Sequence, residues 1–482
     1  MRAPFVMPIL AALFVGGMCA AAQAAAPSEK SAARPAMGPL RVHPENPRYF
    51  ADPGGRAVYL TGAHTWANLV DIGPTDPPPA FDFDAHLDFL ERRHHNFIRL
   101  WAWEPFTWNT KGNNQNALHT ARPQPYARSG PGNATDGKPK FDLTKYDDEY
   151  FRRLRTRVKA AQKRGIYVSI MLFEGWAMQF SPGAWKSHPY HPDNNVNQIN
   201  GDSDGDGNGL EIYALADPAV TALEEAYVRK VIDVVNDLDN VLYEISNENH
   251  PGSTKWQYHI IRFIKEYEKK QPKQHPVGMT FQYKGGSNQT LLDSPADWIS
   301  PNPQAAKPFE YRANPPPADG KKVILSDTDH LWGIGGNVPW VWKSFTRGLN
   351  PLFMDPYDGV VLGPKADDKW EPIRRNLGHT RRYAERMNLA AMTPRGDLAS
   401  SQYCLANPAK EKAEYLVYLP EGGKVTVDLS AAAGELSVEW FDPKTDKATP
   451  GDKAIAGGGK REFTAPFAGD AVLYLTGVGS GR

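Results

Sequence analysis

Eight short apolar segments alternate with segments of helical periodicity, and this alternation restricts the fold more than any other feature of the chain. The apolar segments are residues 57–62, 96–101, 166–173, 240–246, 276–281, 297–300, 322–326 and 351–354. The helical segments are residues 81–95, 147–164, 218–238, 254–271, 340–348 and 370–387. Strands that are apolar on both faces are typical of parallel sheets covered by helices. The pattern therefore predicts an α/β fold, a closed (β/α)8 or TIM barrel.

The pattern changes at about residue 394. Segments with alternating apolar and polar residues, separated by Gly, Pro and Asp turns, follow at 414–419, 424–429, 436–441, 461–464 and 471–475. They predict a small antiparallel β-sandwich of roughly 90 residues. We therefore expect a barrel domain at 27–393, which begins with a hairpin at 40–57, and a C-terminal sandwich at 394–482.

The first 26 residues have the features of a secretory signal peptide. Arg2 supplies a positive charge, residues 5–15 form a short apolar run, and residues 20–26 offer Ala-x-Ala cleavage sites. The apolar run is too short to span a bilayer. We therefore expect a secreted or periplasmic protein. Cleavage would remove Cys19 and leave Cys404, which alone cannot form an internal disulfide.

The charge composition excludes one class of partner. Basic and acidic residues both number 55, so the formal net charge is zero. The sequence has no block of lysines and arginines like those with which proteins bind nucleic acids. We therefore expect neither a nucleic-acid partner nor a membrane span.

Polar residues follow two of the predicted barrel strands directly. Asn247 and Glu248 come after the strand at 240–246, and Asp327 and Asp329 come after the strand at 322–326. In (β/α)8 barrels, catalytic groups gather at the carboxyl ends of the strands, here called the rim. An Asn-Glu pair by itself also fits a surface loop, but the apolar strand before it favours a position at the rim.

The segment Tyr-Glu-Ile-Ser-Asn-Glu-Asn at 243–249 resembles the fourth-strand motif of the clan A glycoside hydrolases, which are retaining (β/α)8 enzymes. Retaining hydrolysis needs two carboxyl groups roughly 5–5.5 Å apart: one protonates the leaving oxygen and the other attacks the sugar. The resemblance implies that Glu248 is the acid/base and that Asn247 holds the sugar 2-hydroxyl. It also implies that Arg99, at the end of the second strand, supports the nucleophile electrostatically.

The resemblance places the nucleophile after the seventh strand, where the clan has Glu and this chain has Asp. Asp327 occupies the first rim position and is our preferred nucleophile. Asp329, two residues on, is the rival, and Glu174, after the third strand, is the spare carboxylate. An Asp pair that only caps the following loop is a further reading.

Other residues that follow strand ends are expected to line the sugar pocket. The chain has 13 Trp and 20 Tyr, which favours sugar stacking, although core packing competes about evenly for each Trp. The expected pocket residues are His64, Trp66, Trp101, Trp103, Glu104, Glu174, Trp176, Gln282, Tyr283, His330, Trp332 and Tyr357.

Two segments carry metal-ligand residue types. Residues 327–330, Asp-Thr-Asp-His, match no standard metal spacing. Residues 202–207 alternate oxygen ligands like a calcium loop, but the twelfth position of that pattern is Tyr213, and Glu211 is out of register. A solvated rim loop fits this segment better than a calcium site, so we expect no resident metal and no cofactor.

Within clan A, the chain is most similar to the apiosidase-like, cellulase-like family. The resemblance spans residues 40 to about 392 and rests on residues 48–50, 59–62, 96–100, 246–249 and 326–330. The C-terminal segment resembles a collagen-binding-type β-sandwich module. A module that only packs against the barrel and supports it explains this segment at least as well as collagen binding does. The expected function is a glycoside hydrolase with a polysaccharide or oligosaccharide substrate. The alternatives are a non-catalytic carbohydrate- or matrix-binding protein, and a metal-dependent hydrolase that uses His64, His330 and Asp329.

Overall fold

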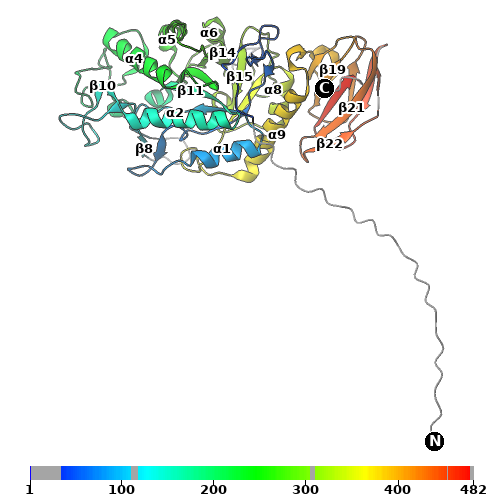
Figure 1. Cartoon of the computed structure of the whole chain (residues 1–482), viewed down its shortest axis with the longest axis horizontal. Coiled ribbons are helices and arrows are strands. Elements are labelled where there is room, and N and C mark those ends of the chain that lie inside the picture. The colour runs from blue at the N-terminus through cyan, green and yellow to red at the C-terminus, as the bar shows by residue number, and fades with distance from the viewer. Residues whose placement is uncertain (2–33, 110–117, 304–309, 453, 457, 478–482) are drawn as a thin grey trace. The chain divides into compact units, whose positions relative to one another are not determined.

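The computed structural model describes Met1 and residues 34–109, 118–303, 310–452, 454–456 and 458–477. The predicted signal peptide, apart from Met1, lies outside the described residues. From residue 34 onward the chain forms a barrel of alternating strands and helices, and antiparallel strands follow it (Figure 1). Within the described part of the chain, none of the helices combines the length and the apolarity needed to span a bilayer.

The predicted barrel is confirmed: one eight-stranded sheet has the order β4-β16-β15-β14-β13-β12-β11-β6, and its paired strands are parallel. The sheet closes where the two end strands meet, because the Asn96 backbone N–H donates to the Thr61 carbonyl at 3.0 Å. The strands are β4 (Gly62–His64), β6 (Phe97–Leu100), β11 (Tyr167–Glu174), β12 (Val241–Asn247), β13 (Val277–Thr280), β14 (Trp298–Ser300), β15 (Val323–Asp327) and β16 (Asn350–Met354).

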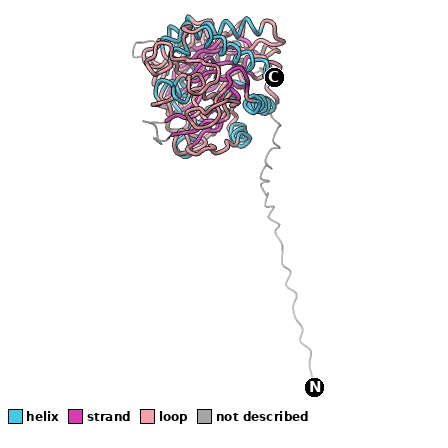
Figure 2. The backbone as a smooth tube through the Cα atoms, turned by 90° about the vertical axis from the view of Figure 1, so that its left-hand side faces the viewer, coloured by secondary structure: helices cyan, strands magenta, loops and turns pink. Residues whose placement is uncertain are grey.

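Helices surround this sheet, and Figure 2 shows the strands in the interior. The larger ones are α1 (Phe83–Arg92), α2 (Asp148–Lys163), α4 (Pro218–Val235), α5 (Thr254–Glu268), α8 (Val338–Thr346) and α9 (Asp367–Arg386); short ones are α3 (Trp176–Phe180), α6 (Asn288–Asp293) and α7 (Thr328–Leu331). Asp82, Asp147 and Asp217 cap α1, α2 and α4 with their side chains. Each of these helices buries an apolar face against the barrel core.

The boundary predicted for the first barrel strand is wrong. The barrel strand is β4, at Gly62–His64, while β3 (Ala57–Val58) pairs with β2 (Phe50–Ala51), which pairs with β1 (Arg41–Val42). The predicted hairpin is therefore a three-stranded sheet, and its apolar residues pack against the amino ends of the barrel strands. The chain leaves one sheet and enters the other at Leu60 and Thr61, whose backbone N–H groups donate to asparagine side chains.

The long segment after the second barrel strand, expected as a loop at 102–140, also contains short strands. Within it, β7 (Thr107–Asn109) and β8 (Leu118–Arg122) form one small sheet with the earlier strand β5 (Asp71–Gly73), and β9 (Tyr126–Ala127) pairs with the following strand β10 (Asp142–Tyr146). Cross-strand hydrogen bonds thus replace part of the expected irregular structure above the rim.

The C-terminal strands are antiparallel, as the alternating pattern predicts. One sheet has the order β17-β18-β19-β25-β21-β22, with β23 beside β21, and β20 pairs with β24. The bounds are β17 (Thr393–Pro394), β18 (Cys404–Asn407), β19 (Glu414–Leu419), β20 (Lys424–Asp428), β21 (Gly434–Asp442), β22 (Lys447–Pro450), β23 (Ala454–Ala456), β24 (Lys460–Thr464) and β25 (Ala471–Gly477). Trp342 of α8 and Tyr383 of α9 share one apolar cluster with Tyr418 and Phe441, so this module packs against the barrel helices.

Candidate active site

Arg99, at the end of β6, organises the rim, and its side chain is almost fully buried. An arginine has five N–H donors, and five hydrogen bonds from Arg99 are present. Nε and Nη2 donate to the two oxygens of Glu244 at 2.9 and 2.5 Å. Nη1 donates to Asp327 at 3.1 Å and to Asp329 at 2.9 Å, and Nη2 donates to Asn247 at 2.6 Å. One guanidinium therefore holds three carboxyl groups and one amide in fixed positions.

Asp327 is fully buried and its oxygens are all engaged. It accepts from Arg99 and from His64 Nε2, the latter at 2.8 and 3.0 Å. It also accepts from the backbone N–H of Asp329 at 3.0 Å, and this bond makes Asp327 the N-cap of α7. Burial by itself would raise the pKa of Asp327, but His64 and Arg99 hold that pKa well below its usual range. The Asp327 carboxylate is thus ionised but has no side open to a ligand.

The hydrogen bonds of His64 fix its tautomer. The Trp101 indole N–H, which can only donate, donates to His64 Nδ1 at 3.1 Å. Nδ1 therefore carries no proton, and Nε2 carries the proton that is donated to Asp327. This arrangement occupies the lone pair that a metal would need.

Asp329 lies in the first turn of α7 and is 7% exposed. Its Oδ2 accepts from Arg99 at 2.9 Å, and its Oδ1 has no hydrogen-bond partner among the described residues. Burial raises the pKa of Asp329 to about 6; Arg99 lowers it and the charge of Asp327 raises it. Asp329 is therefore a carboxyl group with one free oxygen that ionises near neutral pH.

Glu248 follows β12 and is also 7% exposed. Its carboxyl group has no hydrogen-bond partner within the described part of the chain. Burial raises its pKa well above the usual value, and Asp329 is the charge that raises it most. The directions of the two shifts therefore favour a protonated Glu248 when Asp329 is ionised. A general acid and a nucleophile need this division.

Asn247 presents a free donor beside these groups. Its Oδ1 accepts from Arg99 and from His330 Nε2, the latter at 3.1 Å, which fixes the amide orientation. Its Nδ2 is buried and has no hydrogen-bond partner among the residues that the structure describes. His330 Nδ1 in turn accepts from the Ser300 hydroxyl at 2.7 Å, and burial lowers the pKa of His330 to about 3. His330 thus orients Asn247, and neither of its nitrogens has a lone pair for a metal.

Glu104 and Glu174 meet at the rim but act as structural acceptors. Glu174 is fully buried, and its two oxygens accept from the backbone N–H groups of Trp176 and Ala177 at 2.8 and 2.7 Å. Glu104 accepts from the Glu174 backbone N–H and from the Tyr213 hydroxyl, both at 2.8 Å. Glu174 is therefore a weaker candidate for a spare nucleophile than the sequence indicated.

The tryptophans that follow strands β4 and β6 form one cluster. Trp66 contacts the rings of Trp101, Trp103, Trp108 and Trp176 at centroid distances of 5.2–5.7 Å. Trp101 and Trp103 are buried at 0% and 1% exposure, so they support the site from the core. Trp176 is half-buried and is the member of this cluster best placed to meet a sugar.

Four predicted pocket residues lie away from the carboxyl cluster or are engaged elsewhere. Gln282 hydrogen-bonds the turn at 250–254 with both ends of its amide. Tyr283, 40% exposed, packs against Phe180. Trp332 packs against Trp340, and Tyr357 packs against α1. No hydrogen bond or ion pair joins the side chains of these four to Arg99, Asp329 or Glu248 among the described residues.

Two residues of the site were missed from the sequence. Glu244, in the middle of β12, makes the bidentate pair with Arg99, and its signal was a single acidic residue inside an otherwise apolar strand. Asn68 accepts from the Trp101 backbone N–H at 3.0 Å and donates to the Arg99 carbonyl at 2.6 Å. Nothing local marks Asn68, because its two partners lie more than 30 positions away.

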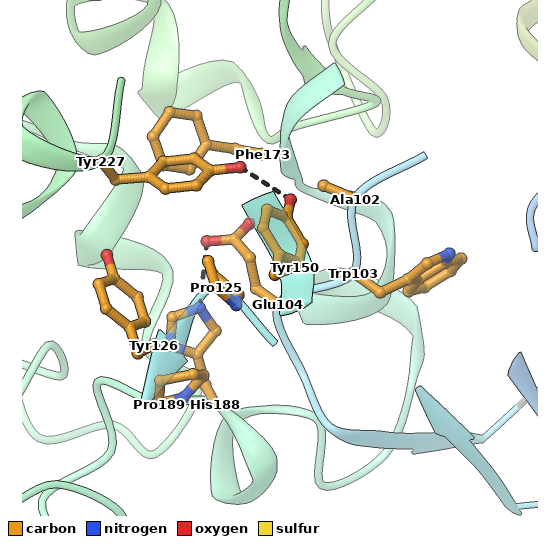
Figure 3. A pocket seen from close by; sticks show the side chains of 10 residues that line it. All are labelled: Ala102, Trp103, Glu104, Pro125, Tyr126, Tyr150, Phe173, His188, Pro189 and Tyr227. Carbon is orange, nitrogen blue, oxygen red and sulfur yellow. Dashed lines mark hydrogen bonds and ion pairs between the residues drawn. The ribbon is translucent and has the colours of Figure 1, made fainter. Parts of the chain in front are cut away.

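A small cavity lies beside the site. Figure 3 shows the Glu104 carboxyl group directed among tyrosines, of which Tyr150 and Tyr227 join their hydroxyls at 3.1 Å. The lining includes neither Glu248 nor Asp329, so this cavity is distinct from the carboxyl cluster. Its lining residues are Ala102, Trp103, Glu104, Pro125, Tyr126, Tyr150, Phe173, His188, Pro189 and Tyr227.

The Asp-rich loop differs from the sequence reading in one respect. Carboxylate oxygens of Asp202, Asp204, Asp206 and Glu211 all lie within 4.8 Å of one another. Glu211 had been judged out of register, but the 3-10 turn at Leu210–Tyr213 brings it back to the aspartates. Exposed acidic groups of this kind are common without an ion, so the geometry alone assigns no metal.

Two family models match parts of the chain. Residues 114–291, which contain Glu174, Asn247 and Glu248, match a domain of unknown function (DUF6298). Residues 396–476 match a family described as "Putative collagen-binding domain of a collagenase", which confirms the resemblance predicted for the C-terminal module. No curated protein matches the sequence.

Solved structures are similar to the chain over nearly its whole length. One, titled "Glycoside hydrolase", has 13% sequence identity and a TM-score of 0.58 and covers 92% of this chain and 98% of its own. A glycoside hydrolase family 5 structure from Bacteroides vulgatus ATCC 8482 has 13% identity and a TM-score of 0.57, with 91% and 94% covered. At this identity the likeness establishes the fold, which is the predicted barrel followed by a β-rich module.

Proposed function

We propose that the protein is a secreted retaining glycoside hydrolase that cleaves O-glycosidic bonds of a polysaccharide or oligosaccharide. One observation carries the proposal: two buried carboxyl groups at the rim, those of Glu248 and Asp329, each have an oxygen without a hydrogen-bond partner among the described residues, and Arg99 holds Asp329 in place. The likeness in fold to structures titled glycoside hydrolases supports the same reading. The predicted signal peptide supports secretion.

In this mechanism Glu248 donates its proton to the glycosidic oxygen while Asp329 Oδ1 attacks the anomeric carbon. The bond between the anomeric carbon and the leaving oxygen breaks, and the sugar becomes an ester of Asp329. The Glu248 carboxylate then takes a proton from water, which attacks the anomeric carbon and releases Asp329. Glu248 ends protonated again, so the cycle balances.

We assign the nucleophile to Asp329 rather than to Asp327, which the sequence favoured. A nucleophile needs an unoccupied oxygen, and each Asp327 oxygen already accepts two hydrogen bonds. Asp327 instead accepts from His64 and caps the first turn of α7, and its carboxylate adds a negative charge next to Asp329. Asn247 Nδ2, which has no partner in the described part of the chain, is the donor for the sugar 2-hydroxyl.

Glu248→Ala is expected to lower kcat/KM by about 10²–10⁴-fold on substrates with poor leaving groups, because it removes the general acid. Substrates with strongly acidic phenol leaving groups need little protonation and should lose much less. The measurement is kcat/KM over a series of aryl glycosides of graded leaving-group pKa. A uniform loss across the series would remove Glu248 from the acid role.

The pH dependence of kcat/KM is expected to be bell-shaped. Activity should fall as the pH drops below about 6, because Asp329 must be ionised and its pKa is raised to about 6. It should fall again at high pH, because Glu248 must be protonated and its pKa is raised well above the usual value. In Glu248→Gln, assayed on activated substrates, the alkaline limb should vanish. The acid limb should stay in place, because Glu248 is uncharged while Asp329 titrates.

The first test of the function is a screen of the mature protein on aryl glycosides and plant oligosaccharides, with NMR of the first-formed anomer. Hydrolysis with retention supports the proposal, and hydrolysis with inversion contradicts the nucleophile. The second candidate is a non-catalytic carbohydrate-binding protein, which the Asp in place of the clan's Glu favours. Saturable sugar binding without turnover would identify it. Chelator treatment should leave hydrolysis unchanged, because both imidazoles of the site are engaged in hydrogen bonds.

A further inference from the structure

Glu248 has an unusual backbone conformation. Its φ is +44°, in the left-handed region that residues with a side chain seldom adopt. Such a conformation is strained and persists only when the surrounding contacts enforce it. The conformation sets the direction in which the carboxyl group leaves the backbone. The contacts that enforce it therefore also aim the proposed acid.

The short helix α3 supplies these contacts. Gln179 Nε2 donates to the Glu248 carbonyl at 2.6 Å and to the Gly175 carbonyl at 3.0 Å. The Gly175 backbone N–H donates to the Asn247 carbonyl at 3.0 Å. A Cβ at Gly175 would lie 2.5 Å from the Asn249 Cα, so the two segments touch backbone to backbone. Helix α3 and its N-cap residue Gly175 thus contact three successive residues of the strand tip, 247, 248 and 249.

Helix α3 is itself held in place from both ends. The Glu174 carboxyl group accepts from the backbone N–H groups of its first two residues, Trp176 and Ala177. Near its other end, Lys284 Nζ donates to the Gln179 carbonyl at 3.3 Å. Five residues are too few for a helix to persist unaided, so this capping explains how Gln179 can act as a fixed donor.

We propose that Gln179 is a positioning residue for the acid/base: its amide holds the Glu248 carbonyl, and through it the left-handed backbone that aims the Glu248 carboxyl group. This inference rests on the proposed function and extends it, because the role of Glu248 is part of that function. Gln179 lies in α3, whereas Glu248 follows β12. Loss of the Gln179 hydrogen bond therefore releases the backbone at Glu248 and leaves the Glu248 carboxyl group itself unchanged.

The test compares Gln179→Met, which keeps the size and loses the donor, with Gln179→Glu, which places an acceptor against the carbonyl. Gln289→Met is the matched control, because it makes the same exchange in another short helix, α6, where Gln289 Nε2 donates to the exposed Asp293 at 2.8 Å. We expect Gln179→Met to lower kcat/KM by about 10–10²-fold on glycosides with poor leaving groups and by less than about 2-fold on activated ones. Gln179→Glu should lose more, and the control should match the wild type.

A second readout does not depend on activity. Hydrogen exchange, followed by mass spectrometry, should be faster in Gln179→Met for the peptides that cover residues 244–250 and 173–178, with the rest of the barrel unchanged. Selective loss on poor leaving groups together with faster local exchange supports the proposal. An equal loss on all substrates, or unchanged exchange, overturns it. If the wild type hydrolyses no glycoside, the proposed function fails, and unchanged exchange would then overturn the backbone role as well.

Discussion

Asp329→Asn is expected to abolish turnover, with a fall of roughly 10⁴–10⁶-fold in kcat/KM, the scale seen when a covalent nucleophile is removed. The matched variant Asp327→Asn should lose far less. The reason is geometric: Asp329 Oδ1 is unoccupied, whereas both oxygens of Asp327 are filled by Arg99, His64 and a backbone N–H. The two substitutions lie two positions apart, on either side of Thr328, and make the same chemical change. A difference in activity between the variants therefore reports which carboxylate the reaction needs.

A trapping experiment decides the assignment directly. An activated 2-fluoro glycoside slows the hydrolysis of the glycosyl-enzyme, and peptide mapping of residues 323–333 then locates the ester. We expect the label on Asp329 in the wild type and in Asp327→Asn, and no label in Asp329→Asn. A label on Asp327, or full labelling of Asp329→Asn, would return the nucleophile to Asp327. Thermal unfolding of both variants serves as the folding control.

Much of the barrel could be predicted because its signals are local. The apolar runs at 166–173 and 240–246 correspond closely to β11 and β12, and the turn to polar residues after them marks the rim. The first strand was misplaced because 57–62 is apolar throughout, and it is divided between two sheets where the backbone N–H groups of Leu60 and Thr61 donate to the distant side chains of Asn350 and Asn96. Local patterning cannot show which partner a strand chooses.

The ranking of the two aspartates was not available from the sequence. Asp327 and Asp329 are the same residue type two positions apart at the same strand end. What separates them is that the chain turns into α7 at Thr328, so that Asp327 becomes the helix cap and Asp329 lies in the first turn, with only its Oδ2 bonded to Arg99. The Arg99–Glu244 pair was missed for a related reason: an acidic residue inside a buried strand has a use only when its partner, 145 positions away, is known.

Arg99→Met is expected to have the largest effect on stability of any single change at the rim. Removing one partner from a buried ionic cluster costs about 3–5 kcal/mol, because the groups left behind stay buried and unpaired. Here Glu244, Asp327, Asp329 and Asn247 would all lose a donor. Because such a variant can fail to fold, Arg99→Lys is the second variant: it keeps the charge but has three donors for five acceptor contacts.

The activity of the folded fraction distinguishes a role in catalysis from a role in folding. Arg99 lowers the pKa of Asp329, so its loss should raise that pKa and move the acid limb of the pH profile above about 6. Arg374→Met is the matched control, because Arg374 is equally buried, at 1% exposure, and pairs in a bidentate way with Asp355, outside the carboxyl cluster. Urea unfolding should show a loss of stability in both variants, whereas only the Arg99 variant should move the acid limb. An unmoved acid limb in a folded Arg99 variant would mean that the guanidinium holds the rim together without tuning the nucleophile.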